Sequence, residues 1–423
     1  MTRSILVVGA GAAGLAAAWA ARRNGHRVTV IAASLGATSL GGGAMDEVPW
    51  ESALRASRLL GAHSCIGTAL AAPVSEQIES LALDLGLWEL PRPPHRMPHL
   101  ATLAGRIRPA RGHDRSLLDL SRIQGGRVVI PRVPRAMWDA DFLGAAFSAD
   151  PFAKASGIHF DPVDLPVLRY DIESRIADGD LAARHDDEAR IGWLAGQVRE
   201  HADRARQSGR PIAAVLLGPW LGASAPRAAA ISERAGVPVG EALAGVGSPA
   251  GLRFEAARDR LFASLEVTLV HARVTTITVE PDGVTATLEQ PQSSAGSERR
   301  ADAVVLAIGG LASGGVIYAP PEHTAEHDLP SRGAVSFALS LHAPVTLAMA
   351  DGPLDVVSSL HGPDLDTTAW PSADRAGVLE TVGIQCRGVR AAPSIFAAGD
   401  VIAATPRTLL EALATGIRAG SEA

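Results

Sequence analysis

The chain of 423 residues is poor in cysteine and in lysine. Its two cysteines, Cys65 and Cys386, are too few for a disulfide framework or for an iron–sulfur cluster of its own. We expect both to be core thiols of a protein in a reducing cytoplasm, and we expect no metal site. Lys154 is the only lysine among 39 basic residues. This bias is typical of a GC-rich bacterial genome and carries no functional signal.

Long hydrophobic runs and an excess of positive charge are also absent. The nearest candidate for a membrane span, residues 303–320, is interrupted by two pairs of glycines, so no spanning helix is predicted. Any attachment to the inner face of a membrane would then go through partner subunits. The net charge is −6 and no basic stripe is present, which argues against a nucleic-acid partner.

A glycine motif near the N-terminus is the most informative feature that is present. Residues 7–15 read VVGAGAAGL, an apolar strand that runs into G-x-G-x-x-G and an alanine-rich helix, and residues 27–31 have the composition of a second strand. In this strand–helix–strand context the glycines predict a phosphate-binding turn at a helix N-terminus. The predicted contacts are Gly9, Gly11, Ala12, Ala13 and Gly14. The same stretch imitates a signal peptide, but its removal would delete the first strand and helix of the sheet.

The acidic residue that normally ends the second strand of this motif is missing. That carboxylate binds the adenosine ribose about 20 residues after the glycines, and here the position is Ala32, followed by Ala33 and Ser34. Either FAD is held by other groups, or the nucleotide lacks the adenosine half, which would make it FMN. A backbone or water contact in place of the acid remains an alternative.

A tract of small residues, numbers 39–45, follows the second strand. It has too few side chains to pack a core, so it is expected to be a place of close backbone approach. In a flavoprotein the chain passes along the isoalloxazine ring here, and a flexible surface loop is the alternative. The predicted contacts in this tract are Ser39, Gly41, Gly42 and Gly43.

Two late strands end in residues suited to the same nucleotide. Residues 301–310 have the pattern of a buried strand that ends in glycines, with Ala307 and Gly309 next to the cofactor. Residues 394–400 form another strand that ends in Gly399 and Asp400, where the carboxylate can accept a hydrogen bond from a ribityl hydroxyl or cap the next helix. The final helix, residues 409–419, carries small residues that are able to lie close to a cofactor.

The middle of the chain alternates strands and helices without a cofactor motif. Strands are predicted at 127–131 and 211–220, and helices at 140–147 and 188–207. We therefore predict an α/β protein: a Rossmann-like parallel sheet made of residues 1–90 and 256–423, with an inserted α/β substrate or capping domain at 91–255. Arginines and histidines are frequent over residues 92–115. They could bind a small phosphorylated or carboxylate substrate, and solvated loop charges are the alternative.

Together these elements resemble the glutathione-reductase-like flavoproteins, and within that class the family of the FMN-carrying subunit of anaerobic glycerol-3-phosphate dehydrogenase. The likeness to this family is carried by the missing acid at Ala32 and by residues 38–46, 127–131, 136–139, 251–253 and 311–315. The sequence departs from the family at residues 403–407, where a glycine-rich tract is expected.

The resemblance implies a subunit with FMN, or alternatively FAD, that works with a catalytic FAD subunit and an iron–sulfur subunit. The assembled complex would oxidise sn-glycerol 3-phosphate and pass electrons towards quinone at the membrane. Two other interpretations stay open: a free-standing FAD oxidoreductase of a small acid or amine, and a scaffold subunit with a degenerate flavin site. None of the thirteen histidines is marked by a motif, so no catalytic base is assigned.

Overall fold

The computed structural model describes residues 2–46, 75–91, 97–290, 293–310, 314–315, 317–319, 340–342, 346–348, 356–357, 383–384, 386–403, 405 and 407–423. These residues belong to two compact units. One contains the chain up to Thr38 and from Phe262 onward, and the other contains Ser39–Asp46 and residues 75–261. The second unit therefore takes in the glycine tract and α4 as well as the predicted insert, and it ends at Leu261 rather than at 255.

The first unit is built on a six-stranded sheet in the order β12-β2-β1-β16-β23-β22. Its strands are β1 (Ser4–Val8), β2 (Arg27–Ala32), β12 (Thr268–His271), β16 (Ala303–Leu306), β22 (Arg390–Ala392) and β23 (Ile395–Ala397). All neighbours are parallel except β22, which is antiparallel to β23. Strand β1 lies in the middle of the sheet, and its residues Ile5–Val8 are buried. Such burial is typical of a central strand in a parallel sheet that is covered on both faces. The predicted Rossmann-like sheet is confirmed.

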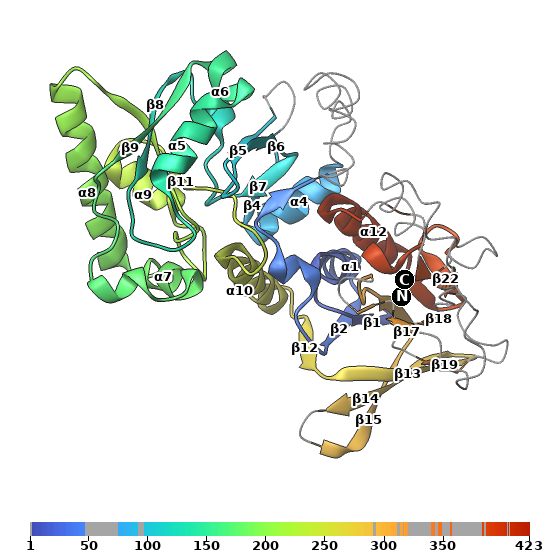
Figure 1. Ribbon diagram of the computed structural model, residues 1–423. Helices are drawn as coiled ribbons and strands as arrows, with labels where there is room; N and C mark the ends of the chain where they lie inside the picture. The colour runs from blue at the N-terminus through green and yellow to red at the C-terminus, as the bar shows by residue number, and fades with distance from the viewer. Residues whose placement is uncertain are drawn as a thin grey trace, which may run out of the picture. The chain divides into compact units, whose positions relative to one another are not determined.

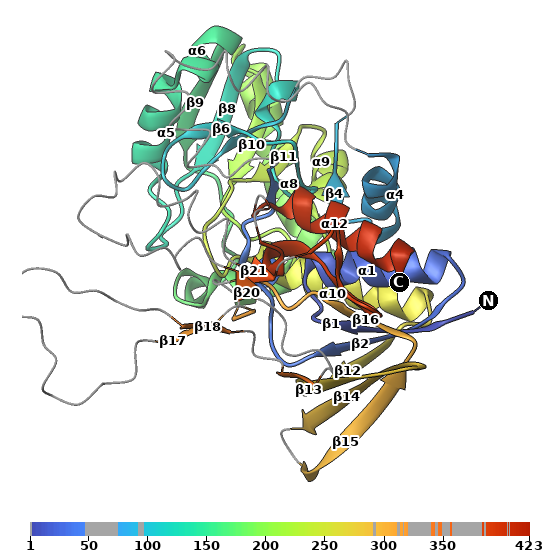
Figure 2. The same ribbon diagram turned by 90° about the vertical axis from the view of Figure 1, so that its right-hand side faces the viewer.

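Two helices of this unit, α1 (Ala12–Arg23) and α12 (Leu409–Glu422), lie side by side against the sheet (Figures 1 and 2). Every residue of α1 from Ala12 to Ala21 is buried. A second sheet, in the order β15-β14-β13-β19, joins β13 (Arg273–Glu280), β14 (Gly283–Gln290), β15 (Ser293–Ala301) and β19 (Thr346–Ala348). Two small pairs complete the strands described in this unit: β17 (Ile317–Ala319) with β18 (Ser340–His342), and β20 (Val356–Val357) with β21 (Gly383–Ile384).

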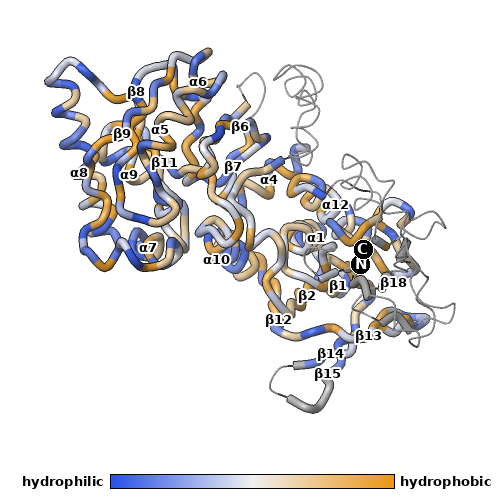
Figure 3. Tube along the Cα trace, in the orientation of Figure 1, coloured by the Kyte–Doolittle hydropathy of each residue, from blue (hydrophilic) through white to orange (hydrophobic). Residues whose placement is uncertain are grey.

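The second unit contains a four-stranded parallel sheet in the order β11-β10-β8-β9. The strands are β8 (Gly126–Pro131), β9 (Ile158–Val163), β10 (Ile212–Leu217) and β11 (Val239–Glu241). The helices are α5 (Ala140–Ala149), α6 (Pro151–Ser156), α7 (Asp178–Arg184), α8 (Glu188–Gln207), α9 (Ala228–Ala235) and α10 (Pro249–Ser264). A hydrophobic core surrounds the sheet, and apolar residues gather around β9, β11 and α9 (Figure 3).

Smaller elements of the second unit precede this sheet in the chain. They are β3 (Ala44–Met45), α4 (Glu76–Leu85), β4 (Trp88–Glu89), β5 (His99–Ala101), β6 (Ile107–Pro109) and β7 (Gly112–Asp114). Strands β5 and β6 pair antiparallel. Cys65 and residues 92–96 of the arginine- and histidine-rich segment lie outside the described residues. Among the helices that the structure describes, none is long and apolar enough to cross a membrane.

Candidate functional site

The glycine motif forms the turn between β1 and α1, and each glycine has a different neighbour. Gly9 has φ +109°, and a Cβ there would overlap the carbonyl oxygen of Ala307. A Cβ at Gly14 would overlap the carbonyl of Gly9. Gly11 is different, because an added Cβ would come no closer than 3.5 Å to any described atom, the hydroxyl of Thr38. The first and third glycines are therefore needed by the fold itself, and Gly11 leaves room for a ligand to approach the backbone.

The N-terminus of α1 is suited to an anion. Gly11 is the N-cap and supplies no side-chain acceptor, and no acidic residue lies in the first turn. The amide of Ala12 donates instead to the hydroxyl of Thr38 at 3.1 Å. The helix dipole and its leading amides favour a phosphate group at this end. Thr38 was missed by sequence reasoning, since it lies 26 residues from its partner.

The end of β2 lacks a carboxylate, as the sequence predicts. The carbonyl of Ala32 accepts a hydrogen bond from the amide of Ala272 at 3.1 Å, and the next residues, Ala33 and Ser34, are exposed. The chain then turns back towards the glycine motif, where a Cβ on Gly36 would lie 3.3 Å from the Cα of Gly11. No charged group of this segment is therefore available to a ribose hydroxyl.

The three separate segments predicted to share one nucleotide do meet in space. The amide of Ala307 donates to Val8 O at 2.8 Å, which holds the end of β16 beside the glycine turn. Gly399 has φ +75°, and a Cβ there would lie 2.8 Å from the Cβ of Ala13. The Cβ of a residue replacing Gly310 would lie 2.8 Å from the backbone oxygen of Asp400. Their convergence on the start of α1 is confirmed, and the flavin contacts of these residues stay a prediction.

Asp400 lies in a short 3₁₀ helix, Gly399–Val401, and does not cap the final helix. Thr408 is the N-cap of α12, where its side chain accepts from the amide of Glu411 at 3.2 Å. The capping alternative for Asp400 is therefore wrong. Burial raises the pKa of Asp400, and the charge of Arg407 opposes this shift. The carboxyl group is thus held in a sheltered position next to a guanidinium.

The small residues of α12 serve helix packing more than ligand binding. A Cβ at Gly416 would overlap Ala13 O and come within 2.8 Å of Ala16 Cβ, and one at Gly420 would overlap Ala17 O. Gly416 and Gly420 therefore let α12 approach the backbone of α1, and at these two small residues α1 takes the space that the sequence left open for a cofactor. The sequence identifies a small residue but does not show which part of the chain packs beside it.

The glycine tract of residues 39–45 is packed within the second unit. A Cβ at Gly42 would overlap Ala244 O, and Gly43 has φ +97° with Asp114 Cβ 2.9 Å from its ideal Cβ. Hydrogen bonds fix the tract at two further points, from Ser248 Oγ to Gly41 O at 3.2 Å and from Gly247 N to Leu40 O at 3.2 Å. Close backbone approach is confirmed, and the flexible-loop alternative is wrong. The hydroxyl of Ser39 is buried without a hydrogen-bond partner among the described atoms.

A buried ion-pair network lies beside this tract. Arg253 is fully buried and donates to Asp114 at 2.8 Å, to Glu241 at 2.7 Å and to Gly222 O at 2.7 Å. Burial raises the pKa of Glu241 to about 7, although the charge of Arg253 opposes this. The pKa of Arg253 is raised as well, because the two carboxylates outweigh its own loss of hydration. The network joins α10 to β7 and β11, and thereby supports the glycine tract through Asp114.

The segment rich in arginine and histidine does not form an open cationic patch where it is described. Arg108 makes a two-fold contact with Asp46, at 2.8 and 3.0 Å. His113 is 2% exposed, and its Nδ1 lies 2.8 Å from Asp114 O. Arg115 points its Nε at Trp88 O, 3.5 Å away. These side chains are used by the fold, so the prediction that they bind substrate is not supported for Arg108 and His113.

Comparison with known proteins finds a family match in the N-terminal part of the chain. Residues 4–150 match the model of a family described as FAD dependent oxidoreductase. No curated protein matches the chain significantly.

Similar solved structures include the anhydrotetracycline hydroxylase OxyS from Streptomyces rimosus, with 12% identity, TM-score 0.32, and coverage of 100% of this chain and 62% of that one. Another is the 3-ketosteroid delta1-dehydrogenase from Sterolibacterium denitrificans, with 16% identity, TM-score 0.28, and coverage of 73% and 48%. The chain spans less than two thirds of either neighbour's length, and scores this low decide neither fold nor function. What the comparisons establish is that residues 4–150 are similar to the FAD dependent oxidoreductases.

Proposed function

We propose that this chain is a flavin-dependent oxidoreductase subunit that holds its flavin at the N-terminus of α1. The observation that carries the proposal is the convergence of the glycine turn, the end of β16 and the Gly399–Asp400 corner on one helix start. The family match over residues 4–150 supports the same chemistry. A structural glycine turn alone would not need glycine at Gly11, because an added Cβ would meet only the Thr38 hydroxyl, at the ordinary contact distance of 3.5 Å.

The finer proposal is an electron-transfer subunit in a dehydrogenase of glycerol 3-phosphate. Its support is the likeness of residues 251–253 and of the glycine tract to the FMN-carrying subunit of the anaerobic enzyme, together with the missing ribose acid at Ala32. In this proposal a catalytic FAD subunit and an iron–sulfur subunit accompany the chain at the membrane and pass electrons towards quinone. In this proposal the chain needs no iron–sulfur cluster of its own, because the iron–sulfur subunit supplies one.

The family match favours FAD, whereas the missing acid favours FMN, the cofactor expected from the sequence. An adenosine ribose would have no carboxylate at the end of β2, so FAD would need other polar groups. The amide-rich turn at Gly11–Gly14 fits the terminal phosphate of FMN and the pyrophosphate of FAD equally well. The identity of the nucleotide is therefore a question for chemical analysis.

When bound, a flavin supplies hydride or single-electron transfer at its N5 atom. The residues of this chain would hold and orient it. The leading amides of α1 would bind phosphate, and Asp400 would accept a hydrogen bond from a ribityl hydroxyl.

The test is to purify the full chain, release its cofactor by heat, and identify it by mass spectrometry. We expect one flavin per chain, and expect Gly11→Asp to lose it because a carboxylate then occupies the phosphate position. Gly196→Ala, on α8 of the second unit with no atom near its Cβ, is the control and should keep the flavin. A folded wild-type protein that binds neither added FMN nor added FAD would overturn the proposal.

The electron-transfer role is tested separately. Co-purification of the tagged chain with a cysteine-rich iron–sulfur subunit and a second flavoprotein supports it. A flavin-containing chain that purifies alone and turns over a small acid or amine without partners contradicts it and favours the free-standing oxidoreductase. A chain without flavin that still binds both partners favours the scaffold.

A further inference from the structure

The corner that carries Asp400 leaves the parallel sheet at Gly399. Ala398 is still joined to the sheet, since its amide donates to Leu306 O at 2.9 Å. Gly399 has φ +75° and turns the chain away, and its carbonyl accepts from the amide of Ile402 at 3.0 Å, which closes the 3₁₀ turn. The amide of Gly399 lies between these two patterns. It needs an acceptor of its own, because Gly399 is buried and a buried amide without an acceptor is costly.

Thr415 on α12 supplies that acceptor. Its Oγ1 accepts from Gly399 N at 2.9 Å and donates to Glu411 O, one turn earlier in the helix, at 2.7 Å. A hydroxyl has one hydrogen, so the bond to Glu411 directs a lone pair of the oxygen at the Gly399 amide. Thr415 is 9% exposed, which leaves water little access as a substitute. The backbone of the corner is therefore tied to α12 by this side chain.

The same stretch of α12 also contacts the start of α1. Gly416, the residue after Thr415, lies against Ala13 O, and a Cβ at Gly399 would lie 2.8 Å from the Cβ of Ala13. Helix α12 runs beside α1 in both views of the ribbon (Figures 1 and 2). Thr415 therefore holds the corner at a fixed place relative to the helix N-terminus to which we assign the flavin phosphate.

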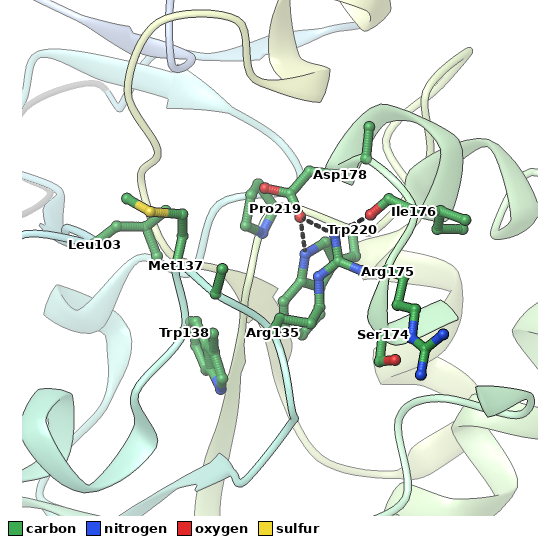
Figure 4. A pocket seen from close by; sticks show the side chains of 12 residues that line it. Leu103, Arg135, Met137, Trp138, Ser174, Arg175, Ile176, Asp178, Pro219 and Trp220 are labelled. Atoms are coloured by element: carbon green, nitrogen blue, oxygen red, sulfur yellow. Dashed lines mark hydrogen bonds and ion pairs between the residues drawn. The ribbon is translucent and has the colours of Figure 1, made fainter. Parts of the chain in front are cut away.

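The position of the Asp400 carboxylate matters because its oxygens are still available. It accepts no hydrogen bond from the described part of the chain, although the charge of Arg407 acts on it. A carboxylate of the second unit shows the opposite case (Figure 4). Asp178 lines a cavity of about 240 Å³, and its Oδ1 accepts from Trp220 Nε1 at 2.9 Å and from Arg135 at 2.6 Å. Asp178 is thus already used by the fold, whereas Asp400 keeps its acceptor capacity for a ligand hydroxyl.

We propose that Thr415 is a positioning residue of the flavin site, which aims the Asp400 carboxylate at a ribityl hydroxyl by holding the Gly399 amide. The inference rests on the proposed function and adds to it a residue that acts through Asp400. A threonine with a purely structural role would have the same effect on the chain with or without that carboxylate. A positioning residue loses its effect on flavin affinity when the carboxylate is removed.

The experiment measures the dissociation constants of FMN and FAD for the full chain, after its own flavin has been removed, by quenching of flavin fluorescence. Thr415→Val keeps the shape of the side chain and removes the acceptor. We expect it to weaken binding of the parent's flavin about tenfold or more, because a hydrogen bond to a charged group is misaligned. Thr415→Ser keeps the hydroxyl and should bind flavin like the parent. Thr275→Val is the matched control, since that hydroxyl donates to Thr287 O at 3.4 Å in the second sheet of the same unit, and it should leave the affinity unchanged.

A double-variant cycle separates positioning from a general loss of stability. Asp400→Ala should weaken flavin binding as well, and Thr415→Val should add little in that background, because its effect passes through the missing carboxylate. Hydrogen exchange of a peptide spanning residues 394–401 gives a second readout on the flavin-free chain. Thr415→Val should speed exchange in this peptide, and Thr275→Val should not. Thr415→Ala removes the hydroxyl with a residue of high helix propensity and repeats each measurement in case the valine variant does not fold.

The outcomes distinguish this inference from the proposed function. A parent chain that binds neither FMN nor FAD overturns both. A parent that binds flavin overturns the inference alone if Thr415→Val binds as tightly, or if the loss is the same with and without Asp400. The inference also fails if Thr415→Ser loses as much affinity as Thr415→Val, if Thr275→Val loses as much, or if exchange over residues 394–401 is unchanged.

Discussion

The contact between α1 and α12 makes the sharpest prediction about this fold. Gly416 and Gly420 lie one turn apart on α12, and each faces a backbone carbonyl of α1. The ideal Cβ of residue 416 would lie 2.8 Å from Ala16 Cβ, and that of residue 420 would lie 2.8 Å from the carbonyl carbon of Ala17. Both atoms belong to a buried helix and not to the end of a flexible side chain. An added methyl group must therefore push the two helices apart.

The magnitude follows from two opposing terms. Replacing glycine by alanine inside a helix stabilises it by about 0.5–1 kcal/mol. Overpacking a tight interface costs about 1–3 kcal/mol. Gly416→Ala and Gly420→Ala should each destabilise the first unit by about 1–2 kcal/mol on balance. Because the two sites share one interface, the double variant should cost less than the sum of the single variants.

The assay is urea unfolding followed by far-ultraviolet circular dichroism, with hydrogen exchange of peptides from α1 to locate the effect. Gly196→Ala is the matched control, since Gly196 is also in a helix but has no atom within 4 Å of its ideal Cβ. It should stabilise the second unit by about 0.5–1 kcal/mol. Glycine-to-alanine substitution should therefore lower the free energy of unfolding at positions 416 and 420 and raise it at position 196. Equal stabilisation by Gly416→Ala, Gly420→Ala and Gly196→Ala would refute the packing described for α12.

Three further predictions concern charge and capping. Arg253→Met should destabilise the chain by about 3–5 kcal/mol at pH 8, because it leaves Asp114 and Glu241 as unpaired buried carboxylates. The loss should shrink at pH 5, which is below the pKa of about 7 that burial gives Glu241, and equal urea midpoints for variant and parent at pH 8 would contradict this. Burial lowers the pKa of His185 to about 4, so the unfolded chain binds more protons below about pH 6.5, and stability should fall by up to about 3 kcal/mol as the pH drops from there to 4. His185→Gln should flatten that slope in pH-dependent urea unfolding, and the exposed His159→Gln should not. Thr38→Val should cost about 1 kcal/mol in thermal unfolding without flavin, because Ala12 loses its acceptor, whereas Thr38→Ser should behave like the parent.

Local patterns were sufficient to predict β1, β2, β16 and β23 of the first unit's sheet and β8 and β10 of the second unit's sheet, but not β9 or β11. Helix α8 runs over Glu188–Gln207 as predicted, because Asp187 caps its first turn by accepting from the amide of Arg190 at 2.9 Å. Strands β1 and β8 were equally predictable from short apolar runs bounded by turn residues. In both cases the signal and the structure lie within a few residues of each other, so no knowledge of the fold was needed.

Contacts between distant segments were not predictable in the same way. Arg253 meets Asp114 across 139 positions of sequence, and nothing near either residue indicates a partner. His113 looked like a substrate ligand in a basic segment, yet it is buried in the strand β7. The strand order β11-β10-β8-β9 in the second unit is likewise not specified by an alternation of strands and helices.

The glycines show why residue type alone stops short of function. Gly9, Gly416 and Gly11 are the same residue type, but in the first two the missing Cβ makes room for this chain's own backbone. At Gly11 an added Cβ would meet only the Thr38 hydroxyl, at the ordinary contact distance of 3.5 Å. Only the third kind is a sign of a ligand. The same reasoning applies at the end of β2, where no carboxylate is present. The chain folds back there and places Gly36 against Gly11, and the hydroxyl of Thr38 accepts a hydrogen bond from the amide of Ala12. A phosphate that binds there must share the helix start with Thr38 and reach the remaining amides from the open side at Gly11. A flavin bound by its phosphate end without help from a ribose carboxylate satisfies both conditions, so the nucleotide released from the wild-type chain tests the geometry as well as the chemistry.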